Sequence, residues 1–224
     1  MIITFDGTSG GGKSTLAKAL SKQTGICFVS TGSIYRAITK KFLNLGISPD
    51  EEKKIKFVLE TTNLEYLHEK DKNIVKVDGL VQQDKDIRSP EVSNSTPLYA
   101  CKEYVREYVR GIQKMLANQY ENIIVEGRDI GSVVFPDADF KFYVDADLKT
   151  RAERRFMDYA SQGKNIALEQ VIKDLQERDN QDQNREHSPL IMTRDSHLID
   201  TTDLSVQECV DKITNIIQEK AIER

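Results

Sequence analysis

A glycine-rich loop near the start of the chain constrains its fold most. Residues 7–14 read Gly-Thr-Ser-Gly-Gly-Gly-Lys-Ser, which matches the pattern G-x-x-x-x-G-K-[ST]. The apolar run at residues 2–5 predicts a buried strand before the loop, and residues 14–23 carry apolar side chains at helical spacing. A strand, a glycine loop and a helix in this order predict a phosphate-binding loop.

The residue types in the loop fit a nucleoside triphosphate. Glycines let the backbone fold tightly around a phosphate, so that N–H groups and the positive end of the following helix point at the anion. Lys13 would bridge the outer phosphates, and the Ser14 hydroxyl would face Mg²⁺. We expect ATP to contact Gly7, Thr8, Ser9, Gly10, Gly11, Gly12, Lys13, Ser14 and Thr15.

The rest of the chain alternates between short apolar runs and helical patterns. Buried strands are expected at residues 26–29, 123–125, 140–144 and 198–200, with helices at 34–45, after 147, after 166 and at 206–220. Parallel strands need helical crossovers, so we predict an α/β fold of three layers with a central parallel sheet. Residues 63–88 alternate and contain Asp78-Gly79, which predicts a small antiparallel insertion. Residues 90–119 are helical again, and Pro97 is expected to mark a break or a fresh first helical turn after Thr96.

Composition narrows the partners. With a net charge of -4, the chain is unsuited to binding a nucleic-acid backbone over a broad surface. Three scattered cysteines suggest neither a disulfide framework nor a zinc site, and no apolar run approaches the ~18 residues that span a bilayer. We expect a cytoplasmic monomer that binds neither nucleic acid nor membrane.

Arginines accumulate in the second half of the chain. Arg151, Arg154 and Arg155 follow a predicted strand, while Arg178 and Arg185 bracket two aspartates in the polar stretch at residues 162–185. A helix rich in arginine most often presents these side chains to solvent. In an acidic protein with a phosphate loop, however, the concentration of arginines favours phosphate binding by a helical flap.

Two further groups of polar residues follow predicted strands, at residues 30–36 and 126–131. Ligands bind at the carboxyl ends of strands in doubly wound sheets, so Arg36 and Arg128 could hold an acceptor anion. Each arginine could instead make an ordinary surface ion pair, and Thr31 could be only a helix cap.

Together these motifs resemble those of the bacterial cytidylate kinase family over essentially the full length of the chain. The resemblance rests on the glycine loop and on residues 31–36, 86–92, 126–136 and 177–185. It implies a single P-loop kinase domain at residues 1–224, with an acceptor-side insertion at 60–90 and a lid at 150–190. It also implies transfer of the γ-phosphoryl group of ATP to CMP or dCMP.

The resemblance also implies roles for single residues. Thr31, Arg36 and Arg128 would meet the acceptor nucleotide, with both arginines on its phosphate. Arg106 and Asp129 would read the cytosine, and Arg178, Asp182 and Arg185 would lie near the acceptor sugar and phosphates. The lid would supply Arg151, Arg154 and Arg155. Residues that act on the transferred group would be Lys13, Arg128, Arg151, Arg155 and Arg178.

Two positions depart from the family pattern. Glu126 stands where the family usually carries Asp, and is assigned with Ser14 to the magnesium site, through water. Pro97 stands where the family commonly has a base-contacting Ser, and it offers neither a hydroxyl nor an N–H. The departure at Pro97 therefore concerns recognition of the base and not recognition of phosphate.

Two other functions remain open at this point. The first is a P-loop kinase for another acceptor, such as a different nucleotide or shikimate. A hydroxyl acceptor would favour a positioned carboxylate base, for which Asp6 and Glu126 are the candidates. A noncatalytic nucleotide switch would transfer slowly or not at all, and the guanine-reading Asn-Lys-x-Asp is absent from the chain.

Overall fold

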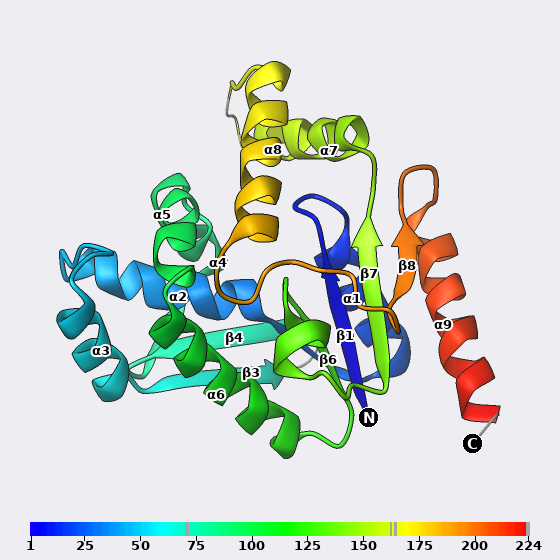
Figure 1. The fold of residues 1–224 in the computed structure, drawn as a ribbon, viewed down its shortest axis with the longest axis horizontal. Helices are drawn as coiled ribbons and strands as arrows, with labels where there is room; N and C mark the ends of the chain where they lie inside the picture. The colour runs from blue at the N-terminus through cyan, green and yellow to red at the C-terminus, as the bar shows by residue number, and fades with distance from the viewer. Residues whose placement is uncertain (70–71, 162, 164, 223–224) are drawn as a thin grey trace. The chain divides into compact units, whose positions relative to one another are not determined.

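The computed structural model describes residues 1–69, 72–161, 163 and 165–222 (Figure 1). The chain divides into two compact units. The first unit comprises Met1–Ile26 and Ile124–Arg224, and the second unit comprises Cys27–Ile123. Each unit is described by itself below.

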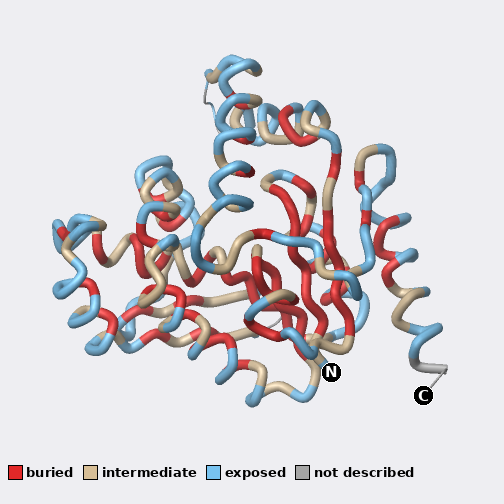
Figure 2. Tube along the Cα trace, in the orientation of Figure 1, coloured by how far each residue is buried: buried red, intermediate tan, exposed pale blue. Residues whose placement is uncertain are grey.

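Parallel strands form the core of the first unit. Strands β6 (Ile123–Glu126), β1 (Ile2–Gly7), β7 (Phe140–Asp145) and β8 (His197–Asp200) are neighbours in that order. Strand β7 is parallel to both β1 and β8, and Phe5 lies opposite Phe142 with their ring centroids 5.3 Å apart. Figure 2 shows β1 and β7 as buried along most of their length. The expected α/β fold with a central parallel sheet is confirmed.

The two faces of β1 carry different side chains, because successive residues of a strand point to opposite sides. Thr4 and Asp6 face a short π-helix, η1 (Ile130–Val134). The carboxylate of Asp6 accepts from the main-chain N–H groups of Ile130 and Gly131 at 2.9 and 2.7 Å. This buried carboxylate fixes the start of η1, which the sequence did not predict.

The helices of the first unit form two groups (Figure 1). Helix α1 (Lys13–Thr24) packs against α9 (Val206–Ile222). Helices α7 (Leu148–Ser161) and α8 (Leu168–Asn184) form a hairpin closed by a small apolar cluster of Ala152, Val171 and Leu175. The helices expected after residues 147 and 166 and at 206–220 are confirmed.

The second unit combines helices with an antiparallel sheet. It begins with strand β2 (Cys27–Ser30), helix α2 (Thr31–Asn44) and helix α3 (Glu52–Thr61). The sheet follows with β3 (Leu64–Glu69), β4 (Lys72–Val77) and β5 (Leu80–Gln82). Asp78 and Gly79, with φ of 51° and 78°, make the two-residue turn between β4 and β5. The expected antiparallel insertion and its turn are confirmed, whereas α3 and β5 were not predicted.

The helical end of the second unit corrects one expectation. After the one-turn helix α4 (Asp84–Ile87), helix α5 (Pro90–Ala100) continues through Pro97, and the break falls between α5 and α6 (Glu103–Gln119). The prediction that Pro97 marks a break or a fresh first turn was wrong. Proline removes its own N–H bond to the carbonyl four residues earlier and its ring crowds that carbonyl, but Pro97 stands in the last turn of the helix, where few residues follow.

Each unit buries one cysteine. Cys27 lies on β2 in the second unit and Cys209 on α9 in the first, while Cys101 is exposed just after α5. Burial raises the pKa of the Cys27 thiol to about 11 and also raises that of Cys209. Among the described helices, none is both long and apolar enough to cross a membrane.

Candidate functional site

The glycine loop lies between β1 and α1 in the first unit, as its sequence context predicts. Gly7 has a φ of 138°, and a Cβ atom there would approach the carbonyl oxygen of Val144 to 1.9 Å, so only glycine fits. Helix α1 begins at Lys13, its N-cap is Gly12, and no side chain caps it or places an acid in its first turn. The positive end of this helix is therefore open to an anion.

Lys13 is a buried cation within the loop. Its Nζ donates to the carbonyl oxygen of Thr8 at 2.5 Å, and the residue is 5% exposed. Burial, together with the nearby Arg128, lowers the pKa of Lys13 to about 7. An anion beside this amine would favour its charged form, which is the form that binds phosphate.

Two oxygen-bearing side chains meet where α1 starts. The Ser14 hydroxyl donates to Glu126 Oε2 at 2.5 Å, and Glu126 is buried at the end of β6. A hydroxyl and a carboxylate beside a phosphate loop are hard oxygen ligands of the kind that Mg²⁺ prefers.

Residues that the sequence reasoning missed also support the loop. The Thr8 hydroxyl donates to Asp145 Oδ1 at 2.5 Å, and the Thr201 hydroxyl donates to the Gly11 carbonyl at 3.0 Å. Arg154 donates to both the hydroxyl and the carbonyl of Thr201. The position of Asp145 at the end of an apolar strand was the available signal, whereas nothing in the sequence near Thr201 indicated its role.

Arginines and aspartates gather in the same unit, and we call Arg128, Asp129, Arg178, Asp182 and Arg185 the Arg–Asp cluster. Arg128 Nε donates to Asp182 Oδ2 at 2.8 Å, and Arg185 lies 3.5 Å from Asp182 and 3.8 Å from Asp129. Burial opposes the charge on Asp182, but Arg128, Arg178 and Arg185 together outweigh it and lower the pKa of this carboxyl. Three guanidinium groups against two carboxylates leave one positive charge in excess.

Arg178 carries that excess. Within the described residues Arg178 makes no hydrogen bond or ion pair. Burial lowers its pKa most, and the nearby Arg128 lowers it as well. Arg155 also acts on it electrostatically, and the guanidinium of Arg155 lies 4.9 Å from the ring of Tyr159. Cations that depress one another's charge in a partly buried site favour binding of an anion.

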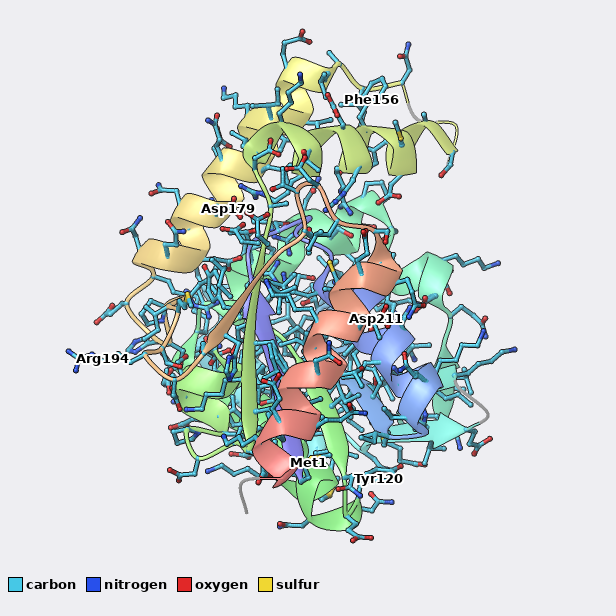
Figure 3. The ribbon with its side chains drawn as sticks, turned by 90° about the vertical axis from the view of Figure 1, so that its right-hand side faces the viewer. Met1, Tyr120, Phe156, Asp179, Arg194 and Asp211 are labelled. Atoms are coloured by element: carbon cyan, nitrogen blue, oxygen red, sulfur yellow. The ribbon has the colours of Figure 1, made fainter. Side chains whose placement is uncertain are left out.

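Arg151, expected among the lid arginines, is held inside the first unit. Its Nη1 donates to Asp179 Oδ2 at 2.5 Å and to the Ser9 carbonyl at 3.0 Å, and its Nε donates to the Ala146 carbonyl at 2.9 Å. Asp179, which the sequence reasoning did not assign, also accepts from the Ser9 N–H at 3.1 Å. Figure 3 labels Asp179 on α8.

Three further predicted residues lie in the second unit. Thr31 and Arg36 are on α2, and the Arg36 guanidinium lies against Gly32, where a Cβ atom would be 3.2 Å from it. Arg106 on α6 is 2% exposed, donates to the Ala100 carbonyl at 3.0 Å and stacks 5.6 Å from the ring of Tyr35. The second unit therefore brings Arg106 close to the helix that carries Thr31 and Arg36.

Comparison with known proteins identifies relatives along nearly the whole chain. The model of a family described as cytidylate kinase matches residues 3–219. A cytidylate kinase of Clostridium botulinum is 38% identical over 216 residues, covering 96% of this chain and 97% of the relative. A cytidylate kinase of Desulfitobacterium hafniense is 40% identical over 218 residues, covering 97% of this chain and 93% of the relative.

Solved structures support the fold. The crystal structure of TT1252 from Thermus thermophilus matches with a TM-score of 0.52 at 16% identity, covering 98% of this chain and 97% of that one. A shikimate kinase of Bacteroides thetaiotaomicron matches with a TM-score of 0.50 at 10% identity, covering 97% and 98%. At these identities the likeness concerns the fold alone.

Proposed function

Because this chain belongs to the cytidylate kinase family, we propose that it transfers the γ-phosphoryl group of ATP to CMP or dCMP, giving ADP and CDP or dCDP. The family makes it an ATP-dependent phosphotransferase. The observation that carries the choice of a phosphorylated acceptor is the Arg–Asp cluster, which holds an excess positive charge in the same unit as the phosphate loop.

The donor nucleotide is assigned to the glycine loop. Main-chain N–H groups of the loop and the open end of α1 bind the phosphates, and Lys13 balances charge that develops between them. Thr8, held by Asp145, and Gly11, held by Thr201, keep the loop in the shape that ATP requires.

The residues present fit a magnesium ion. Mg²⁺ usually takes one or two protein oxygens, several waters and the substrate phosphates. Ser14 would supply an oxygen to the ion directly, and Glu126 would act on it through a bound water. When bound, the ion neutralises charge on the outer phosphates of ATP. The hydrogen bond between Ser14 and Glu126 holds both oxygens ready on one side of the loop.

The acceptor phosphate is assigned to arginines. Arg128 and Arg178 belong to the cluster of the first unit, and Arg36 belongs to the second unit. Guanidinium groups bind phosphate oxygens in pairs, and they offset the repulsion between donor and acceptor phosphates. Thr31, Asp182 and Arg185 are assigned to the acceptor sugar and phosphate.

This chemistry needs no protein base. The second pKa of a phosphate monoester is about 6, so the acceptor is mostly dianionic near pH 7 and attacks the γ-phosphorus directly, in line with the leaving ADP. Both carboxylate oxygens of Asp6 accept main-chain N–H groups, and Glu126 accepts from Ser14. These contacts disfavour the alternative in which one of them deprotonates a hydroxyl acceptor.

Cytosine recognition is assigned to Arg106 and Asp129, both buried. The Asp129 carboxylate would accept from the exocyclic amine of cytosine, which uracil lacks, and Arg106 would donate to the ring acceptors. Since Pro97 offers no hydroxyl, Ser95, Thr96 or a water must take the place of the family's serine, and selectivity should be looser than is usual.

Two segments receive roles from the family. The antiparallel sheet within residues 60–90 is assigned to the acceptor side, and the α7–α8 hairpin within residues 150–190 is assigned as a lid that excludes water during transfer. Exclusion of water prevents hydrolysis of ATP without transfer. We assign the monomer as the working form.

An ATP-coupled assay over a panel of nucleoside monophosphates tests the proposal. CMP and dCMP should outperform UMP, AMP and GMP in kcat/KM, because an unpaired buried polar group at the base costs about 1–3 kcal/mol. The Asp129→Ala variant should narrow the gap between CMP and UMP mainly by lowering activity on CMP. Equal kcat/KM for CMP and UMP in the unmodified protein would contradict the cytosine assignment and leave the monophosphate kinase standing.

A further inference from the structure

The main chain of Ser9 in the phosphate loop is held at both its carbonyl and its N–H by the α7–α8 hairpin. Its carbonyl accepts from Arg151 Nη1 on α7 at 3.0 Å, and its N–H donates to Asp179 Oδ1 on α8 at 3.1 Å. The other carboxylate oxygen of Asp179 accepts from the same Arg151 nitrogen at 2.5 Å. Ser9, Arg151 and Asp179 therefore close a ring of hydrogen bonds, which we call the Ser9 clamp.

The clamp is not needed to hold the hairpin together. Helices α7 and α8 already pack through Ala152, Val171 and Leu175, with further apolar side chains around them. Arg151 and Asp179 are 7% and 9% exposed, and a buried ion pair of this kind is often no more stabilising than apolar side chains of similar volume. What the ion pair adds, and apolar packing could not, is the attachment to the main chain of Ser9.

The loop is built to accept this attachment. Gly10, with a φ of 80°, follows Ser9, and a Cβ atom there would lie 3.3 Å from the Cβ atom of Arg151. The backbone thus passes directly against α7. Because the Ser9 N–H is engaged by a carboxylate, the N–H groups that remain for phosphate lie further along the loop, toward the start of α1.

The same helix also carries the Arg–Asp cluster. Arg178 precedes Asp179, and Asp182 lies one turn further along α8, where it accepts from Arg128. A rigid helix held to the loop at Asp179 fixes the distance from the loop to Arg178 and Asp182. Loss of the clamp would free the loop at Ser9, and the distance from the loop to Arg178 and Asp182 would no longer be fixed.

We propose that Arg151 and Asp179 are positioning residues, which hold Ser9 so that the loop is ordered for ATP and kept in register with the cluster. The proposal rests on the assignment of the loop to ATP. In this role Arg151 acts through the main chain of Ser9 rather than by touching the transferred phosphoryl group.

The test separates positioning from stability by using a double variant. In Arg151→Met/Asp179→Leu, apolar side chains replace the ion pair and should keep the melting temperature of the nucleotide-free protein near that of the unmodified protein. ATP affinity, measured by calorimetry without an acceptor, should still fall about tenfold. The single variant Asp179→Asn keeps an acceptor for the Ser9 N–H and should lose less ATP affinity than Asp179→Ala.

Steady-state kinetics give the second readout. The KM for ATP should rise in these variants while the KM for CMP stays within about twofold. Lys173→Ala, which removes an exposed ion pair with Glu177 on the same helix, serves as the matched control and should change neither. If the double variant has both the melting temperature and the ATP affinity of the unmodified protein, Arg151 and Asp179 serve only stability, and the proposal is overturned.

The outcomes also distinguish this proposal from the proposed function. If the unmodified protein binds ATP but phosphorylates neither CMP nor dCMP, the acceptor assignment fails, and weakened ATP binding in the variants still supports the clamp. If the variants bind ATP normally while the unmodified protein phosphorylates CMP, the clamp is refuted and the cytidylate kinase assignment stands.

Discussion

At the scale of single residues, Lys13 is placed to act on charge rather than to hold the fold. Among the residues that the structure describes, its amine donates a hydrogen bond only to the Thr8 carbonyl, and burial lowers its pKa. We predict that Lys13→Ala lowers kcat with ATP and CMP by about 10²–10³, the usual cost of losing one such electrostatic group.

The control is Lys18→Ala on the exposed side of the same helix, which should leave kcat unchanged. Thermal melting of both variants should match the unmodified protein. Near-normal turnover in Lys13→Ala would remove this lysine from the chemistry.

Asp6 gives a prediction about pH. Burial raises the pKa of Asp6 to about 6 in the folded protein, although the Gly131 and Ile130 N–H groups, which bind its charged form, lower it. The folded state therefore holds a proton between about pH 4 and 6 that the unfolded chain releases, so this residue's contribution to stability decreases as pH rises through that window. From pH 7 to pH 5 the unmodified protein should gain about 1 kcal/mol of unfolding free energy relative to Asp6→Asn.

Carbon NMR of the Asp6 carboxyl should show a midpoint near pH 6, and denaturant unfolding at pH 5, 6 and 7 should give the stability difference. A midpoint near pH 4, or a difference between the two proteins that does not vary with pH, would contradict this account of the buried carboxylate.

At the scale of elements, replacing glycine by alanine should change the unfolding free energy in opposite directions in a turn and in a helix. Gly79 has a φ of 78° in the turn between β4 and β5, where a side chain is strained. Gly111 lies exposed in α6, with open space where its Cβ atom would be, so alanine there favours the helix. We predict that Gly79→Ala costs about 1 kcal/mol of unfolding free energy, whereas Gly111→Ala adds up to about 1 kcal/mol. Chemical denaturation of both variants checks the two signs.

Elements with strong local patterns could be predicted from the sequence. The strand before the loop, helix α1 and the Asp78-Gly79 turn all follow from side chains that are adjacent in the chain. Helix α3 was missed because its buried stripe is narrow, with only Ile55 and Leu59 buried among charged neighbours.

Helix η1 could not be predicted for a different reason. Residues 130–134 are mostly β-branched and apolar, which locally favours a strand. Asp6, more than a hundred residues earlier in the chain, supplies the acceptors that start the helix. A tertiary contact of this kind overrides local preference and leaves no periodic signal.

At the scale of the whole molecule, the proposed acceptor arginines come from both units. Arg36 lies on α2 in the second unit, and Arg128 follows β6 in the first. We predict that Arg36→Ala and Arg128→Ala each weaken CMP use far more than ATP binding, because each is assigned to the acceptor phosphate and losing one partner of a desolvated charge pair costs about 2–5 kcal/mol.

Calorimetry with ATP alone and kinetics with varied CMP separate the two effects. Arg110→Ala, which removes an ion pair with Glu103 on α6, controls for loss of an arginine in the second unit and should leave the KM for CMP unchanged. Variants that bind CMP normally but lose ATP would reverse the assignment of these arginines.

The donor half of the site was easier to predict than its supports. A continuous motif names the loop residues, and their strand–loop–helix context is confirmed by the structure. Asp145, Asp179 and Thr201 support the loop from three later segments, so no spacing in the sequence connects them to it. The roles assigned to the acceptor residues stay predictions, because they rest on side-chain type and family resemblance.

The placement of the three thiols allows local unfolding of each unit to be measured by thiol modification. Exposed Cys101 should consume one equivalent of a maleimide at once, whereas Cys27 and Cys209 are shielded, each in a different unit. After Cys101 is blocked, a brief pulse of maleimide followed by mass spectrometry of the peptides gives the modification rates of Cys27 and Cys209 in one sample. If the units open independently, Cys27 and Cys209 are modified at different rates. ATP, which we assign to the loop of the first unit, should slow modification of Cys209 more than that of Cys27.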